Sequence, residues 1–226
     1  MEELDNSVNS FVKRADSDLI TYYARNSKAK LDAQDVKLII DLVDYFRSNS
    51  TDSKRNSLVV LLHTLGGNIN AAIGLMDYLK SEYSTINSIV FKVAKSSGAF
   101  VALSSKPCFM YTGSVLSDFT LDPDMEATKE YTEAQRRSML LAFEGVCGLM
   151  DSKYWVQRFV LNPNHGAPIL KQELLDQGKG GVQRVSEFPS RTKALGYVHN
   201  EIVNSFKKPG NPFSKIIGYN DYFLGL

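Results

Sequence analysis

Two strand-to-helix units between residues 57 and 103 constrain the fold more strongly than any other feature of this sequence. Each begins with a run of apolar residues, continues through a turn of small and polar residues, and ends in apolar residues at helical spacing. The parts of the two units are, in order, Ser57–His63, Thr64–Asn68 and Ile69–Leu79, then Ile89–Ala94, Lys95–Gly98 and Ala99–Leu103. This pattern predicts an α/β fold in which parallel strands alternate with helices.

The spacing of the two turns predicts that they lie side by side. Ser96 follows Gly66 by thirty residues, which is about the length of one β/α/β crossover. A right-handed crossover brings the carboxyl ends of successive parallel strands to the same edge of a sheet, where the turns leave backbone N–H groups exposed. The two turns can therefore hold a serine nucleophile beside donors for an oxyanion, which is the arrangement that acyl transfer requires.

Each turn also has a simpler structural interpretation. Paired glycines such as Gly66 and Gly67 occur in tight turns of many kinds. A serine between a strand and a helix, such as Ser96, is a common helix N-cap. The two motifs therefore favour a catalytic site only in combination, through their spacing and their strand contexts.

The same residues resemble the active-site turns of the Clp-protease-like serine peptidases. His63-Thr-Leu-Gly66-Gly67 is similar to the HTPGG or SPGG turn of that superfamily. Ala94-Lys-Ser96-Ser97-Gly98-Ala99 is similar to its A-x-S-x-G turn. The order, the spacing and the preceding strands agree as well, so the resemblance includes both halves of the predicted site.

Within this superfamily the sequence is most similar to the serine dehydrogenase proteinase (SDH) group. The predicted helix from Ala71 to Leu79 nearly follows that group's A-x-x-I-x-x-x-L pattern. Leu121-Asp122-Pro123-Asp124 resembles its I-D-P-Q motif, and residues 190–198 resemble its closing A-x-x-L-G-L-x-V motif. The likeness covers roughly residues 18 to 200.

The resemblance implies a ClpP/crotonase-like β/α spiral with a largely parallel sheet and a helical arm. It also implies a serine-type endopeptidase, a hydrolase that acts on peptide or protein substrates. Ser96 is then the nucleophile, and the N–H groups of Gly66 and Ser97, with Gly67 in the same turn, form the oxyanion hole.

The general base is the least defined part of the predicted site. Clp-type peptidases place a histidine about 25 residues after the serine, and residues 117–122 contain none. The three histidines of the chain are His63, His165 and His199. His63 belongs to the glycine turn, where it is expected to orient the loop rather than to act as the base.

Relatives with a Ser-Lys dyad take the base from further along the chain. Lys129 and Lys153 are the candidate bases, and Asp122 is a candidate orienting group that alternatively caps the following helix. A lysine acts as a base only where desolvation lowers its pKa, and the neighbours of neither lysine are apolar enough to indicate this. For each lysine, a solvated surface position is the competing interpretation.

Composition excludes several other classes of protein. The chain has 26 Lys and Arg residues against 25 Asp and Glu residues, so no basic surface for nucleic acid or an anionic membrane is predicted. Cys108 and Cys147 lie in apolar settings without metal-ligand spacing, which predicts reduced thiols; we expect no metal and no cofactor. No secretory signal and no apolar run of ~18 residues is present, so we expect a cytoplasmic protein.

We expect residues 1–226 to form one domain. Its appendages are an N-terminal helix within residues 1–17, a helical arm at 126–177 with a short helix near Ile169 to Asp176, and an aromatic tail at 207–226. The N-terminal helix is expected to cover the core, whereas the tail packs on the body or on a partner subunit. In the resembled family the arm contributes to oligomer contacts. From Thr132 to Phe159 it carries more apolar residues than a small domain is expected to cover by itself, so we expect a homo-oligomer.

Two other functions are compatible with this sequence. A catalytically inactive ClpP-fold scaffold or binding subunit is one, because no base is evident. The acyl-CoA-handling crotonases share the β/α spiral and its paired N–H groups, but the serine turn and the H-T-x-G-G motif weigh against them.

Overall fold

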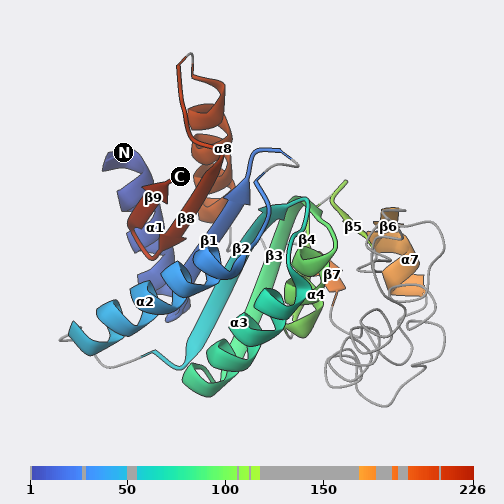
Figure 1. Cartoon of the computed structure of the whole chain (residues 1–226), viewed down its shortest axis with the longest axis horizontal. Coiled ribbons are helices and arrows are strands. Elements are labelled where there is room, and N and C mark those ends of the chain that lie inside the picture. Colours follow the sequence, from blue (N-terminus) through green and yellow to red (C-terminus); the bar gives the residue numbers. More distant parts are fainter. Residues whose placement is uncertain are drawn as a thin grey trace.

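The computed structural model describes residues 2–26, 29–49, 55–105, 107–111, 113–117, 168–176, 185–187, 193–208 and 210–226. In this part of the chain, nine strands form one sheet with helices on both faces (Figure 1). The strands are β1 (Asp18–Ala24), β2 (Ser57–Thr64), β3 (Thr85–Ala94), β4 (Cys108–Met110), β5 (Val115–Ser117), β6 (Pro168–Leu170), β7 (Val185–Glu187), β8 (Lys215–Tyr219) and β9 (Tyr222–Gly225). The helices are α1 (Glu2–Ala15), α2 (Ala33–Asn49), α3 (Ile69–Glu82), α4 (Ser97–Ser104), α7 (Lys171–Asp176) and α8 (Lys193–Lys207).

The centre of the sheet is parallel, and antiparallel strands join it at both ends of the main strand order. The strand order is β6-β5-β3-β2-β1-β8-β9, and β4 pairs with both β3 and β7. β1, β2 and β3 run parallel to one another, and β3 also pairs in parallel with β4 and β5. β6, β8 and β9 join in antiparallel pairs. The predicted α/β class is confirmed, with a sheet that is partly parallel.

Alternate side chains of the central strands face two separate cores. Ile20 and Tyr22 of β1 pack with helices α2, α3 and α4, whereas Leu19 and Tyr23 pack with α1 and α8 on the other face. This alternation follows from the two-residue period of a strand. Three apolar residues of α1 are buried in the second core, so this helix covers part of that face of the sheet.

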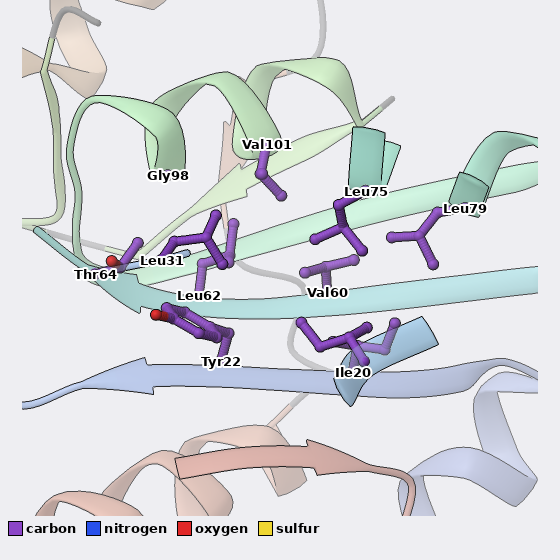
Figure 2. A pocket seen from close by; sticks show the side chains of 11 residues that line it. Ile20, Tyr22, Leu31, Val60, Leu62, Thr64, Leu75, Leu79, Gly98 and Val101 are labelled. Atoms are coloured by element: carbon purple, nitrogen blue, oxygen red, sulfur yellow. The ribbon is translucent and has the colours of Figure 1, made fainter. Parts of the chain in front are cut away.

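The core beneath α3 and α4 is closely packed. It contains a void of about 10 Å³ whose lining is apolar apart from the Tyr22 and Thr64 hydroxyls (Figure 2). A space of this size holds at most one water molecule. It is therefore a packing defect and not a substrate pocket.

Two segments differ from the sequence-based expectation. Residues 168–170 form β6 against β5, and the helix begins only at Lys171, so the predicted helical start near Ile169 is wrong. The C-terminal tail forms the hairpin β8–β9 beside β1, and Tyr219 stacks on Phe46 at 5.4 Å between ring centroids. The tail therefore packs on the body of the protein.

The arm from Thr132 to Phe159 lies outside the described residues, so the homo-oligomer stays a prediction. Cys147 also lies outside them, while Cys108 is a buried free thiol. Among the described helices, none is both long enough and apolar enough to cross a bilayer.

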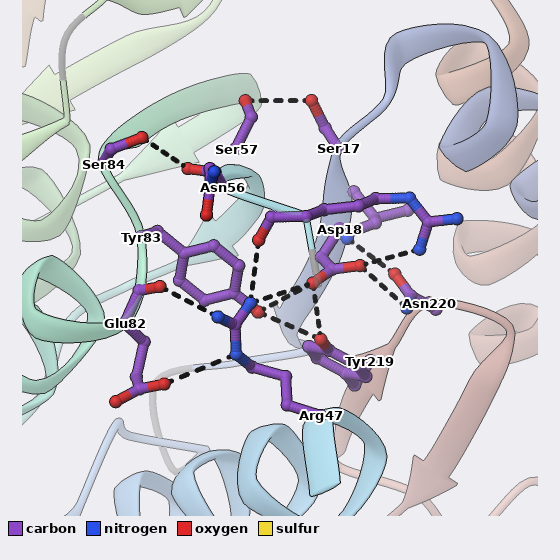
Figure 3. A network of polar contacts seen from close by, with 12 residues as sticks. Ser17, Asp18, Arg47, Asn56, Ser57, Glu82, Tyr83, Ser84, Tyr219 and Asn220 are labelled. Carbon is purple, nitrogen blue, oxygen red and sulfur yellow. Dashed lines mark hydrogen bonds and ion pairs between the residues drawn. The ribbon is translucent and has the colours of Figure 1, made fainter. Parts of the chain in front are cut away.

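A buried polar network joins the first strand to four other segments (Figure 3). The Asp18 carboxylate accepts hydrogen bonds from Tyr219 at 2.7 Å, Tyr83 at 3.0 Å and Arg55 at 3.2 Å. The Arg47 guanidinium lies 3.7 Å from the same carboxylate and 4.5 Å from the centre of the Tyr83 ring. Because Asp18 is only 3% exposed, these partners replace the water that its charge would otherwise require.

Candidate active site

Ser96 has an uncommon backbone conformation at the turn between β3 and α4. Its φ is 48° and its ψ is −124°, although it is not a glycine. Its side chain is partly exposed and makes no capping hydrogen bond to the helix that it precedes. The alternative in which the Ser96 side chain caps the helix is therefore wrong. A strained strand-to-helix turn that exposes a serine hydroxyl is typical of a nucleophile elbow.

The strain at Ser96 predicts that replacing it with glycine stabilises the protein. Glycine adopts a positive φ without steric cost, so Ser96→Gly should raise the free energy of unfolding above that of Ser96→Ala by about 1 kcal/mol. Urea denaturation of the two variants measures this difference. The same comparison at exposed Asp77 in the middle of helix α3 is the control, because Asp77→Gly should be less stable than Asp77→Ala by about 0.5–1 kcal/mol. If Ser96→Gly is less stable than Ser96→Ala, the backbone at residue 96 is not strained.

The glycine turn after β2 lies directly against Ser96. A β-carbon on Gly66 would be 2.6 Å from Ser96 Cβ and 2.9 Å from the Lys95 carbonyl oxygen. A β-carbon on Gly67 would be 2.1 Å from the Leu31 carbonyl oxygen. Both distances are too short for any side chain. Ser96 and Lys95 therefore require glycine at position 66, and Leu31 requires glycine at position 67. The two turns lie side by side, as predicted, because β2 and β3 pair in parallel and end opposite each other at Thr64 and Ala94.

The N–H group of Gly66 is already engaged within the turn. It donates to Thr64 Oγ1 at 3.1 Å, whereas the sequence-based hypothesis assigned it to the oxyanion hole. The Gly66 carbonyl accepts a hydrogen bond from Leu31 N–H at 2.9 Å. In a planar trans peptide the next N–H, that of Gly67, points the opposite way. The Gly67 N–H therefore points away from Leu31, and it lies in the turn that contacts Ser96.

Ser97 is the first residue of α4 and its side chain is fully buried. Among the described residues, neither the Ser97 N–H nor the Gly67 N–H has a hydrogen-bond acceptor. The Ser96 N–H, in contrast, donates to Ser117 Oγ at 3.3 Å. The two N–H groups that remain available beside Ser96 are thus those of Gly67 and Ser97.

Thr64 and Ser117 were not identified from the sequence. Thr64 follows His63 in the predicted turn. The sequence does not show that its hydroxyl accepts a hydrogen bond from the Gly66 N–H, because this contact depends on how the turn folds. Ser117 ends β5, and it reaches Ser96 because β5 pairs with the end of β3, at Val93 and Ala94. The contact between the two serines crosses a 21-residue separation that sequence periodicity does not reveal.

His63 lies on the opposite face of the sheet from Thr64. Its ring is 5.5 Å from that of Tyr23, and the Tyr23 hydroxyl hydrogen-bonds His199 Nδ1 of α8 at 2.6 Å. The His199 ring stacks on Phe91 at 4.4 Å. Because Thr64 contacts α4 and its neighbour His63 faces the α8 side, His63 belongs to this aromatic cluster. It is not directed toward the helix that Ser96 opens.

The lowered pKa values of His63 and His199 predict that the protein becomes less stable to unfolding in acid. Burial, followed by the nearby Lys92 charge, lowers the pKa of His63 to about 4. Burial and then the charges of His63 and Lys92 lower the pKa of His199 to about 4. Between pH 6.5 and 4 the unfolded chain therefore binds more protons than the folded chain, and the free energy of unfolding falls as the pH falls. The slope should approach about 1.4 kcal/mol per pH unit for each histidine.

Urea titrations at several pH values test this expectation. His199→Gln, which keeps an acceptor for the Tyr23 hydroxyl but cannot titrate, should flatten the pH dependence. If the free energy of unfolding falls with the same slope in His199→Gln and in the wild type between pH 6.5 and 4, His199 does not contribute to the loss of stability in acid.

The candidate bases Lys129 and Lys153 and the candidate orienting group Asp122 lie outside the described residues, as does His165. Within the described residues, no hydrogen bond joins the Ser96 hydroxyl to a basic side chain. No group of three or more metal-ligating side chains occurs in the part of the chain that the structure describes.

Comparison with known proteins identifies the fold. No protein-family model matches the sequence, and no curated protein matches it either. Among solved structures, a point mutant of ClpP1 from Listeria monocytogenes is similar, with a TM-score of 0.58 and 13% identity over 81% of this chain and 97% of that chain. ClpP1 from the same organism gives a TM-score of 0.54 and 14% identity over 83% and 96%. The chain therefore has the mixed α/β fold of ClpP, at a low sequence identity.

Proposed function

We propose that this protein is a ClpP-like serine peptidase of the serine dehydrogenase proteinase type, with Ser96 as its nucleophile. The observation that carries the proposal is the backbone conformation of Ser96, with φ 48° and ψ −124° at a strand-to-helix turn. Such a conformation costs about 1–3 kcal/mol and persists where function requires the side chain to be presented. The hydroxyl is partly exposed and does not cap the helix, which leaves it available to a substrate.

The oxyanion hole in this proposal consists of the Gly67 and Ser97 N–H groups. Both lie in turns that meet at Ser96, and neither has an acceptor among the described residues. The Ser97 N–H is also at the N-terminus of α4, where the helix dipole favours negative charge. Gly66 contributes by its lack of a side chain, because any β-carbon there would collide with Ser96.

The reaction proceeds in two steps. Ser96 Oγ attacks the carbonyl carbon of the scissile peptide while a base accepts the hydroxyl proton, and the oxyanion accepts hydrogen bonds from Gly67 and Ser97. Collapse of this intermediate expels the amine, which takes up the proton, and leaves an ester on Ser96. Water then attacks the ester, and the same two N–H groups stabilise the second oxyanion until the acid product leaves and Ser96 is regenerated. Lys129 or Lys153 is the proposed base, with Asp122 as the group that orients it.

A catalytically inactive ClpP-fold scaffold is the second candidate. It is favoured by one observation: no basic side chain of the described residues is hydrogen-bonded to the Ser96 hydroxyl. A scaffold has no need to keep a strained serine at this turn, since glycine would occupy the position at lower cost. The strain therefore favours the peptidase.

A fluorophosphonate carrying a fluorophore distinguishes the two candidates, because it phosphonylates only an activated serine. The proposal predicts one label per chain, at Ser96, when the modified peptide is identified by mass spectrometry. Ser81→Ala is the matched control: Ser81 is an exposed serine bonded to the Tyr78 carbonyl, and its loss should leave labelling unchanged. A wild-type protein that remains unlabelled would favour the scaffold.

A further inference from the structure

Thr64 contacts both turns of the candidate site through different parts of the residue. Its Oγ1 accepts the Gly66 N–H hydrogen bond at 3.1 Å. Its carbonyl accepts a hydrogen bond from Lys95 N–H at 3.0 Å, and its Cγ2 fills the space beside Gly98, where a β-carbon would lie 2.3 Å away. The side chain is fully buried, so no water competes for these contacts. Figure 2 shows Thr64 at the end of β2, beneath the start of α4 at Gly98.

These contacts hold the two peptide groups on either side of Gly66. The Gly66 N–H belongs to the peptide group before Gly66 and is held by Thr64 Oγ1. The Gly66 carbonyl belongs to the peptide group that carries the Gly67 N–H, and it accepts hydrogen bonds from Leu31 N–H at 2.9 Å and from the Thr64 hydroxyl at 3.5 Å. With both planes held, rotation about Gly66 is restricted and the Gly67 N–H keeps one direction. Glycine pairs otherwise allow such a plane to rotate, since neither residue has a β-carbon to restrict it.

We infer that Thr64 is a positioning residue that holds the oxyanion-binding N–H of Gly67 toward Ser96. This inference rests on the proposed function and adds the device that keeps the hole formed without substrate. Donors that are oriented in advance stabilise an oxyanion without reorganising during the reaction. Thr64 touches neither the substrate nor Ser96 Oγ, and acts only through the turn.

Two variants separate the hydroxyl from the rest of the side chain. Thr64→Val keeps the shape that packs against Gly98 and removes the acceptor for Gly66 N–H. Thr64→Ser keeps the acceptor and removes the methyl group. The inference predicts that the rate constant for labelling at saturating fluorophosphonate falls about 10- to 100-fold in Thr64→Val, with the half-saturating concentration unchanged. In Thr64→Ser this rate constant should stay within about threefold of the wild type, which a purely packing role would not produce.

Amide hydrogen exchange of the full-length protein supplies a readout that does not depend on activity. Gly66 N–H should exchange at least about tenfold faster in Thr64→Val and not in Thr64→Ser, because only valine leaves this donor unpaired. Lys95 N–H, which is bonded to the Thr64 main chain, is the internal control and should keep its rate in both variants.

The outcomes distinguish this inference from the proposed function. Equal labelling of Thr64→Val and the wild type, or equal slowing in Thr64→Ser, overturns the inference while the nucleophile stands. If the wild type is not labelled, the proposed function fails, and exchange alone decides: faster exchange at Gly66 in Thr64→Val supports the role of Thr64 in holding the turn, and unchanged exchange overturns it.

Discussion

Ser96→Ala should abolish fluorophosphonate labelling and lower the hydrolysis of fluorescein-labelled casein by about 10³-fold or more. The alanine removes the only atom that forms the covalent intermediate, and the oxyanion hole by itself retains a small fraction of the rate. The backbone turn should persist, because Ser96 Oγ makes no capping bond. The free energy of unfolding should therefore stay within about 0.5 kcal/mol of the wild-type value.

Two further observations make this result interpretable. Ser81→Ala should cleave casein at the wild-type rate, since the Ser81 hydroxyl donates to the Tyr78 carbonyl on the exposed surface of α3. Circular dichroism of Ser96→Ala should match the wild type. A Ser96→Ala protein that cleaves casein as fast as the wild type would remove Ser96 from the mechanism.

Asp18→Asn should destabilise the protein by about 3–5 kcal/mol, which is the cost of breaking a buried ion pair by removing one partner. Asp18 is buried, and its loss leaves Arg47 and Arg55 without their shared negative charge. Urea denaturation followed by circular dichroism measures this loss. Asp18 lies at the start of β1, at the amino edge of the parallel strands, so the folded variant should still be labelled at Ser96.

Asp41→Asn is the matched control for this carboxylate. Asp41 pairs with Lys37 on the exposed face of α2, where both side chains are more than half exposed. Such surface pairs contribute about 0.2–1 kcal/mol. An Asp18→Asn variant no less stable than Asp41→Asn would show that the Asp18 network does not hold the strands together.

The central strands and helices could be predicted because their signals are local. Apolar runs, each followed by a turn and helical spacing, predicted β2 and α3 near their observed limits and the end of β3, whereas β3 starts at Thr85 and not at the predicted Ile89. β6 was missed because its three apolar residues run directly into α7 without a breaking residue. The hairpin β8–β9 was missed because glycine, proline and asparagine surround it, although Asn220 at φ 50° marks its turn.

For the candidate site, the sequence predicted which two turns come together, but not which of their N–H groups are available to a substrate. The positions of Gly66, Gly67 and Ser96 followed from motif spacing. Which glycine N–H remains available depends on the Thr64 hydroxyl and on Leu31, which lies far from the turn in the sequence. The Asp18 network likewise joins residues up to 202 positions apart. Contacts of this kind arise from the tertiary fold, which no local pattern specifies.

A crystal structure of the fluorophosphonate adduct would show the nucleophile and the oxyanion hole together. We expect phosphorus bonded to Ser96 Oγ, with the phosphoryl oxygen about 2.7–3.1 Å from both the Gly67 nitrogen and the Ser97 nitrogen. The Gly66 nitrogen should stay bonded to Thr64 Oγ1. An adduct on another serine would exclude Ser96 as the nucleophile, and a phosphoryl oxygen turned away from both N–H groups would exclude this oxyanion hole.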